Sequence, residues 1–169
     1  MNGDAVPFFR IYKEGHLMVQ DKDIRNFVDQ LSKERNFFVV DIQNKKGKIK
    51  VIIDDYKGIM LDECIDVNRE IRGFFEDQID DYDLEVTSPG LNEPFKVFAQ
   101  YEKNVGNKVE VLRKDGSQVT GKLVGAKPEQ IEVEEKKRIK TDKKKKKTIH
   151  QQHTIAWNDI HHTKLIISF

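Results

Sequence analysis

The most chemically distinctive part of the chain is a lysine-rich segment at residues 136–147, where nine of 12 residues are basic. Its basic members are Lys136, Lys137, Arg138, Lys140, Lys143, Lys144, Lys145, Lys146 and Lys147. Ammonium groups packed this densely repel one another, and RNA phosphates relieve that repulsion while releasing counterions. We therefore expect a loop between two strands that contacts RNA but reads no base sequence, because phosphate contacts position a protein without specifying. A solvated loop that only aids solubility is the alternative.

The other residue types capable of chemistry form no recognised catalytic or metal-binding pattern. His150 and His153 are three residues apart on a predicted strand, so they face opposite sides and cannot share a metal ion. Cys64 occupies a helix core position, where we expect an inert thiol. The paired carboxylates at 54–55 and 80–81 fall at predicted turns, where Asp is common. We predict no catalytic residue, metal, cofactor or enzymatic activity.

The two halves of the chain carry opposite charge. Residues 19–93 hold 11 basic and 18 acidic residues, a net charge of −7, whereas residues 94–169 hold 17 and nine, a net charge of +8. This indicates two units, an acidic one suited to a basic protein partner and a basic one suited to nucleic acid. No apolar run approaches the roughly 20 residues needed to cross a bilayer. With a single cysteine as well, we expect a cytoplasmic protein without membrane contact.

Hydropathy periodicity in the first half predicts an αββαβ order of helices and strands. The predicted elements are residues 21–36, 37–43, 48–54, 60–78 and 82–87, with a turn at 44–47. Asp21 or Asp23 is expected to cap the first helix. The second helix is expected to turn these side chains inward: Leu61, Cys64, Ile65, Ile71, Phe74 and Phe75. Both helices would cover one face of a three-stranded sheet, with Glu85 on the outer side of the third strand.

The second half predicts an all-β unit after a linker at about residues 91–105, which includes a short helical turn at 95–98 packing at the domain junction. The expected strands are 108–112, 119–126, 131–135, 149–156 and 164–168, with a helical turn at 157–160. Gly121 and Gly125 would permit the sharp bending of a small barrel. Trp157 is expected to close the barrel core rather than to stack on RNA. The predicted fold class is α+β, with a C-terminal SH3-like or Sm-like barrel.

The run Tyr82-Asp-Leu-Glu-Val-Thr-Ser-Pro-Gly-Leu91 resembles the signature of the ribosome maturation factor RimP family, in which a strand ends in a similar Ser-Pro-Gly-Leu motif. Residues 61–64, 105–109, 121–123 and 155–165 also follow that family's pattern, and the resemblance covers about residues 19–169. It implies a non-catalytic factor that binds the free 30S subunit during late 16S rRNA maturation. It also implies contact with a small-subunit protein, S12 in this family.

One departure from the family pattern affects the expected contacts. Where many relatives have Gly-Leu-Asp-Arg-Pro, this chain has Asn92 and Glu93, so we expect no phosphate contact at that position. Ser88, Pro89, Gly90 and Leu91 are expected to form either a hinge or an edge that faces the ribosome. Glu85 is either a plain outward residue or a partner for a basic ribosomal protein.

These inferences divide the chain into a leader at 1–18, an α/β domain at 19–92 and a barrel at 93–169 that carries the lysine-rich loop. We expect the natural chain to start at Met18, the alternative being a short ordered arm anchored by Phe8, Phe9 and Tyr12. A monomer is expected. A generic Sm-like RNA-binding or RNA-chaperone protein is the competing interpretation, and Sm-type proteins usually close into rings.

Overall fold

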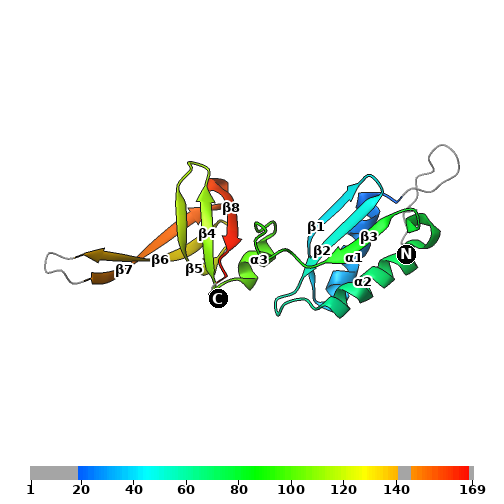
Figure 1. Cartoon of the computed structure of the whole chain (residues 1–169), viewed down its shortest axis with the longest axis horizontal. Coiled ribbons are helices and arrows are strands. Elements are labelled where there is room, and N and C mark those ends of the chain that lie inside the picture. Colours follow the sequence, from blue (N-terminus) through cyan, green and yellow to red (C-terminus); the bar gives the residue numbers. More distant parts are fainter. Residues whose placement is uncertain (1–18, 141–145, 168–169) are drawn as a thin grey trace, which may run out of the picture. The chain divides into compact units, whose positions relative to one another are not determined.

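A computed structural model describes residues 19–140 and 146–167 of the chain. The chain forms two compact units, the first ending at Pro89 and the second beginning at Gly90, so the division falls inside the Ser-Pro-Gly-Leu run (Figure 1). Each unit has a hydrophobic core of its own. The predicted leader and Lys143 to Lys145 of the lysine-rich segment lie outside the described residues.

The first unit has the predicted αββαβ order. Its elements are α1 (Asp21–Arg35), β1 (Phe38–Lys45), β2 (Lys48–Asp54), α2 (Leu61–Phe75), a 3-10 turn η1 (Glu76–Ile79) and β3 (Asp83–Thr87). The sheet order is β1-β2-β3, with β1 antiparallel and β3 parallel to the central β2. A parallel neighbour requires a crossover connection, and α2 supplies it. Both helices lie against one face of this sheet (Figure 1).

The core of the first unit lies between the two helices and the inner face of β2. Ile49, Val51 and Ile53 alternate along β2 and are fully buried. They pack with buried residues of both helices: Ile24, Val28 and Leu31 of α1, and Cys64, Val67, Ile71 and Phe75 of α2. Full burial of one such aliphatic side chain contributes roughly 1.5–3 kcal/mol. Tertiary packing therefore holds the helices, and local propensity alone would not.

Three of the six side chains expected to turn inward on α2 do not. Leu61, Ile65 and Phe74 are 74%, 39% and 49% exposed, respectively. The buried stripe runs instead through Cys64, Val67, Ile71 and Phe75, and the three exposed residues lie outside it. Phe74 still stacks on the ring of Phe27 at 4.2 Å between centroids, so it covers the rim of the core.

Two local details of the first unit also differ from the prediction. The N-cap of α1 is Gln20, which makes no side-chain capping bond, while Asp21 and Asp23 lie in the first helical turn. Negative side chains there still favour the helix, because its N-terminus carries partial positive charge. The hairpin turn is shorter than expected: Lys46 and Gly47 both have positive φ, 49° and 81°. That pair of angles is typical of a type I′ turn, which matches strand twist.

The second unit is a short helix on a bent antiparallel sheet. Its elements are α3 (Phe98–Lys103), β4 (Lys108–Arg113), β5 (Gln118–Ala126), β6 (Gln130–Lys140), β7 (Lys146–Ala156), a 3-10 turn η2 (Trp157–Asp159) and β8 (Ile160–Leu165). The strand order is β7-β6-β5-β4-β8, and among the described residues no ladder closes the sheet. The inner face carries a buried aliphatic core: Val109, Val111, Val119, Leu123, Ile131, Val133 and Ile155. The arrangement is barrel-like, as predicted.

Three predicted boundaries in this unit are wrong. The helix begins at Phe98 rather than at Phe95, and Phe95 packs on the core of the second unit through the ring of Tyr101. The last strand runs from Ile160 to Leu165 instead of 164–168, because β8 pairs along β4 immediately after η2. The largest difference is at the lysine-rich segment, where strands β6 and β7 extend far beyond their predicted ends.

Candidate nucleic-acid interface

Strands β6 and β7 form a long two-stranded ribbon, which contains the whole described part of the lysine-rich segment. They pair at 11 successive positions, from Gln130 opposite Ala156 to Lys140 opposite Lys146. The far half of this ribbon extends past the ends of β4 and β5 (Figure 1). The expected loop over 136–147 is therefore wrong for its described residues, because the ladder that starts in the core continues outward along the same register.

Strand alternation sorts the cations of the ribbon onto two faces. Residues opposite each other in an antiparallel pair share a face, and every second residue returns to it. The outer face, which is the solvent side of the sheet, receives Lys136, Arg138, Lys140 and Lys146. The inner face, which continues the core side of the sheet, receives Lys137 and Lys147. The composition of the run alone predicts one undivided cluster of cations and does not distinguish these two faces.

The inner face is electrically compensated near the barrel. Glu135 accepts a hydrogen bond from Nε2 of His153 at 2.8 Å and pairs with Nζ of Lys137 at 3.2 Å. These contacts, the His153 bond first, hold the pKa of Glu135 below its usual value. Lys137 also donates to Oε1 of Gln151 at 3.1 Å. A guanidinium nitrogen of Arg113 lies 3.4 Å from Nδ1 of His153 and completes this polar cluster.

The outer face is not compensated in this way. Lys136, Arg138, Lys140 and Lys146 have no ion pair with any residue of 19–140 or 146–167. The nearest acid on this face, Glu134, is 3.2 Å from Nδ1 of His150. His150 and His153 thus face opposite sides of the ribbon, as their spacing predicted. The outer face carries a row of exposed cations on a rigid backbone.

Glu85, the interface residue predicted on the sheet of the first unit, is paired with cations. Glu85 lies on the open face of the sheet, where its carboxylate contacts Nζ of Lys48 at 3.0 Å and of Lys50 at 3.3 Å. The hydrogen bond from Lys48, followed by the one from Lys50, lowers the pKa of Glu85, and the same carboxylate raises the pKa of Lys48. Because two cations already neutralise Glu85, its charge is a weak attraction for a basic partner.

Ser88, Pro89, Gly90 and Leu91 lead from β3 into a turn. The amide of Glu93 donates to the carbonyl of Gly90 at 3.0 Å, and Leu91 is 68% exposed at the turn. Gly90 does not have positive φ; instead, a side chain there would come within 2.9 Å of Cγ of Glu93. A side chain at this position would therefore require the side chain of Glu93 to move. The run therefore presents one apolar side chain at the boundary of the two units.

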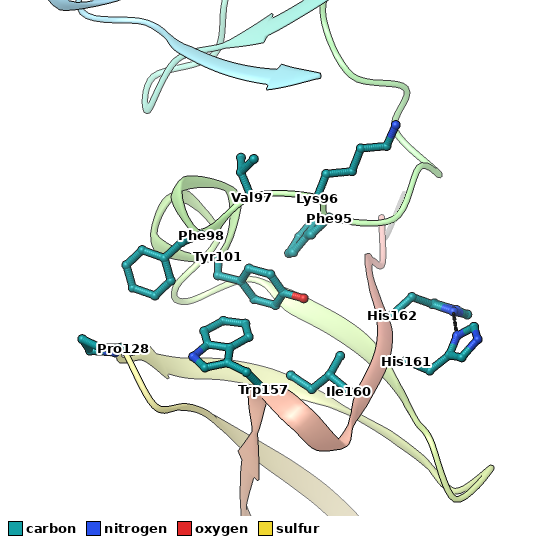
Figure 2. Close-up of a pocket in the computed structure, with 10 residues that line it drawn as sticks. All are labelled: Phe95, Lys96, Val97, Phe98, Tyr101, Pro128, Trp157, Ile160, His161 and His162. Atoms are coloured by element: carbon teal, nitrogen blue, oxygen red, sulfur yellow. Dashed lines mark hydrogen bonds between the residues drawn. The ribbon is translucent and has the colours of Figure 1, made fainter. Parts of the chain in front are cut away.

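Trp157 belongs to an aromatic cluster that packs α3 onto the sheet (Figure 2). Its ring meets Tyr101 edge to face at 4.8 Å and Phe98 at 5.8 Å, and its Nε1 donates to the carbonyl of Lys127 at 3.0 Å. A groove of about 540 Å³ beside these rings is lined by Phe95, Phe98 and Pro128 among others. Trp157 is partly buried and packs against the core of the second unit, at the edge of the predicted core. The sequence did not identify Tyr101 as its partner, because the packing of α3 is a tertiary feature.

Cys64 and the paired carboxylates occupy the settings expected for them. Cys64 is 4% exposed, and burial raises the pKa of its thiol, which suits an unreactive core residue. Asp54 accepts a hydrogen bond from the amide of Asp55 at 2.9 Å, so this pair organises the turn after β2. No group of three or more potential metal ligands occurs among the described residues.

Comparison with known proteins identifies the family. The family model of the RimP N-terminal domain matches residues 25–92, from α1 through the turn after β3. A ribosome maturation factor RimP from Porphyromonas gingivalis is 34% identical over 149 residues, which cover 88% of this chain and 98% of that protein. The chain belongs to the ribosome maturation factor RimP family.

Other members of the RimP family align over a similar extent. The protein of that name from Cytophaga hutchinsonii is 31% identical over 163 residues, covering 89% of this chain and 98% of the relative. The one from Christiangramia forsetii is 28% identical over 155 residues, covering 90% and 100%. The RimP N-terminal domain match ends at Asn92, so the basic ribbon lies outside it. Family membership connects the chain with ribosome maturation. The role of the ribbon is inferred from its own geometry and charge.

Proposed function

We propose that this protein is a non-catalytic assembly factor that binds the free small ribosomal subunit in the cytoplasm during late maturation. Its β6–β7 ribbon would contact 16S rRNA, and its acidic first unit would contact a basic small-subunit protein, S12 by analogy with the family resemblance. The observation that carries the proposal is the row of cations on the ribbon without acidic partners among the described residues.

Charge and exposure support the rRNA contact. The described part of the lysine-rich segment is exposed on both strands of the ribbon, and like charges held at fixed spacing repel one another. Contact with phosphates removes this repulsion and releases condensed counterions, so the affinity depends steeply on salt concentration. Strand geometry fixes the cations before binding, which reduces the conformational entropy lost on association.

The first unit supports the protein contact through its net charge. Residues 19–89 have 17 acidic residues against 11 basic ones, and such a surface repels rRNA and attracts a basic protein. The exposed hydrophobic residue Leu61 on α2 adds apolar area of the kind found at protein interfaces. No helix in the described part of the chain is long and apolar enough to cross a membrane.

Sedimentation of the whole chain with purified free small subunits tests the proposal. At low salt the protein is expected to migrate with the subunit peak, and a variant with Gln at Lys136, Lys137, Arg138, Lys140, Lys146 and Lys147 is expected to shift toward the top of the gradient. Wild-type protein that stays at the top at low salt would refute the proposal. Light scattering should report a monomer; a ring-sized oligomer would favour the Sm-like alternative instead.

A further inference from the structure

The outer face of the ribbon continues into a groove on the barrel. Lys122 of β5 is opposite Glu134 in the register, and Lys108 of β4 is opposite Lys122, so both lysines share the outer face with Lys136. A groove of about 550 Å³ is lined by Lys108, Thr120, Lys122 and Lys136, and also by Glu134 and Glu135. We use the term basic track for the following residues together: Lys108, Lys122, Lys136, Arg138, Lys140 and Lys146.

Cations outnumber acids on the described part of this face. None of the six members of the basic track makes an ion pair with another described residue. Glu134 lies opposite Lys122 of the track, and each acid of this face also lies beside a side chain outside the track. These pairs are Glu132 with Lys127, Glu134 with His150, and Glu110 opposite Lys164. Among the described residues, the track therefore carries six cations that make no ion pair, and Glu134 lies beside two of them, Lys122 and Lys136.

We infer that the basic track binds the phosphate backbone of double-helical RNA. Alternate strand residues are about 6.8 Å apart, so Lys136, Arg138 and Lys140 present three charges in a straight row about 14 Å long. A fixed row of charges suits the fixed phosphate row of a duplex. Double-stranded RNA is recognised mainly by shape and by phosphate and sugar contacts, since its deep groove excludes side chains.

The composition of the face separates this ligand from single-stranded RNA. Proteins that bind single strands add aromatic side chains on which successive bases stack. Over the described strand residues, the outer face of β4 to β7 has no Phe, Tyr or Trp. Trp157 is in the cluster beneath α3, with its donor satisfied by Lys127. The outer face therefore offers positive charge but no aromatic ring on which a base could stack. A flexible single strand of RNA would gain little binding energy from such a face.

This inference rests on the proposed function and refines it, because it assigns the RNA contact to one face of the ribbon. Two double variants separate the faces while removing the same number of cations from the same ribbon. Arg138→Gln with Lys140→Gln alters the outer face, and Lys137→Gln with Lys147→Gln alters the inner one. All four residues are exposed, so both variants should keep the wild-type thermal midpoint, which is checked first.

Binding is measured by fluorescence anisotropy over a series of salt concentrations, with a short RNA duplex and with one of its strands alone. The outer variant is expected to bind the duplex about tenfold more weakly and to lower the slope of log affinity against log salt by about two. The inner variant should change the slope by less than about one half. Wild type is expected to prefer the duplex to the single strand.

Three other outcomes are possible, and each would refute either the assignment to the outer face, the role of the ribbon or the choice of RNA ligand. Equal losses in both variants would refute the assignment to one face and leave the proposed rRNA binding intact. No loss in either variant would refute both the assignment and the role of the ribbon in the proposed function. A single strand bound as tightly as the duplex would refute the choice of ligand.

Discussion

Replacing Gly121 with alanine tests the close approach of β5 and β6 from which the ribbon projects. A Cβ atom at Gly121 would lie 2.3 Å from the carbonyl oxygen of Glu134 and 2.7 Å from its carbonyl carbon, whereas ordinary contacts are 3.4–4 Å. Both atoms belong to the backbone, so the strands must separate by about 1 Å and stretch their ladder. Overpacking in well-packed regions costs about 1–3 kcal/mol. We expect the upper end, about 3 kcal/mol, in the free energy of unfolding of the second unit.

The two units can be followed separately during urea unfolding. Trp157 is the single tryptophan and lies in the second unit, so its fluorescence reports on that unit. Circular dichroism at the helical band reports mainly on the first unit, which contains the two 15-residue helices. With a dependence on urea of about 1 kcal/mol per molar, the fluorescence midpoint of Gly121→Ala should fall by about 2–3 M. The helical midpoint should stay unchanged.

Two glycine controls match this substitution. A Cβ at Gly125, on the same strand, would meet Oε2 of Glu132 at 3.1 Å, a side chain that can rotate away, so Gly125→Ala should cost less than about 1 kcal/mol. Gly73 lies in α2 with nothing within 4 Å, and Gly73→Ala should raise the helical midpoint, by about 0.5–1 kcal/mol in stability. A fluorescence midpoint for Gly121→Ala within about 0.3 M of wild type would refute the steric argument.

Three further predictions concern the first unit, and each is tested by urea unfolding followed at the helical band. Phe75→Ala should cost about 3–4 kcal/mol and Phe74→Ala about 1 kcal/mol, because Phe75 is 2% exposed and Phe74 is 49% exposed; equal costs would contradict the observed burial. Gln20→Ser should stabilise α1 by about 0.5–1 kcal/mol by adding the missing capping bond, with Gln20→Ala as the control that adds none. Glu85→Gln should reduce the loss of stability between pH 7 and pH 3: the folded-state pKa of Glu85 is lowered, so its contribution exists above the unfolded pKa and disappears as pH falls through the folded one. An unchanged pH dependence would count against the pairing of Glu85 with Lys48 and Lys50.

Much of the fold could be predicted because its signals are local. The apolar spacing of Ile24, Val28 and Leu31 predicts α1, and the alternation of Ile49, Val51 and Ile53 predicts β2 and its buried face. Turn residues between such segments then fix the element order, and the charge asymmetry indicates two units. The run from Tyr82 to Leu91 resembles the signature of the RimP family, and this resemblance depends on no tertiary information. These features depend on residues near one another in the chain.

The sequence alone determined the composition of the lysine-rich segment, while the tertiary structure decided its form and faces. Lysine has little preference for strands, so a run of lysines predicts a loop. Hydrogen bonding to β7 overrides that preference, since the ladder begun by the core residues Ile131 and Ile155 continues to Lys140 and Lys146. This register decides the face on which each cation lies and the acid that neutralises it. Register joins residues distant in the chain, and no local pattern encodes it.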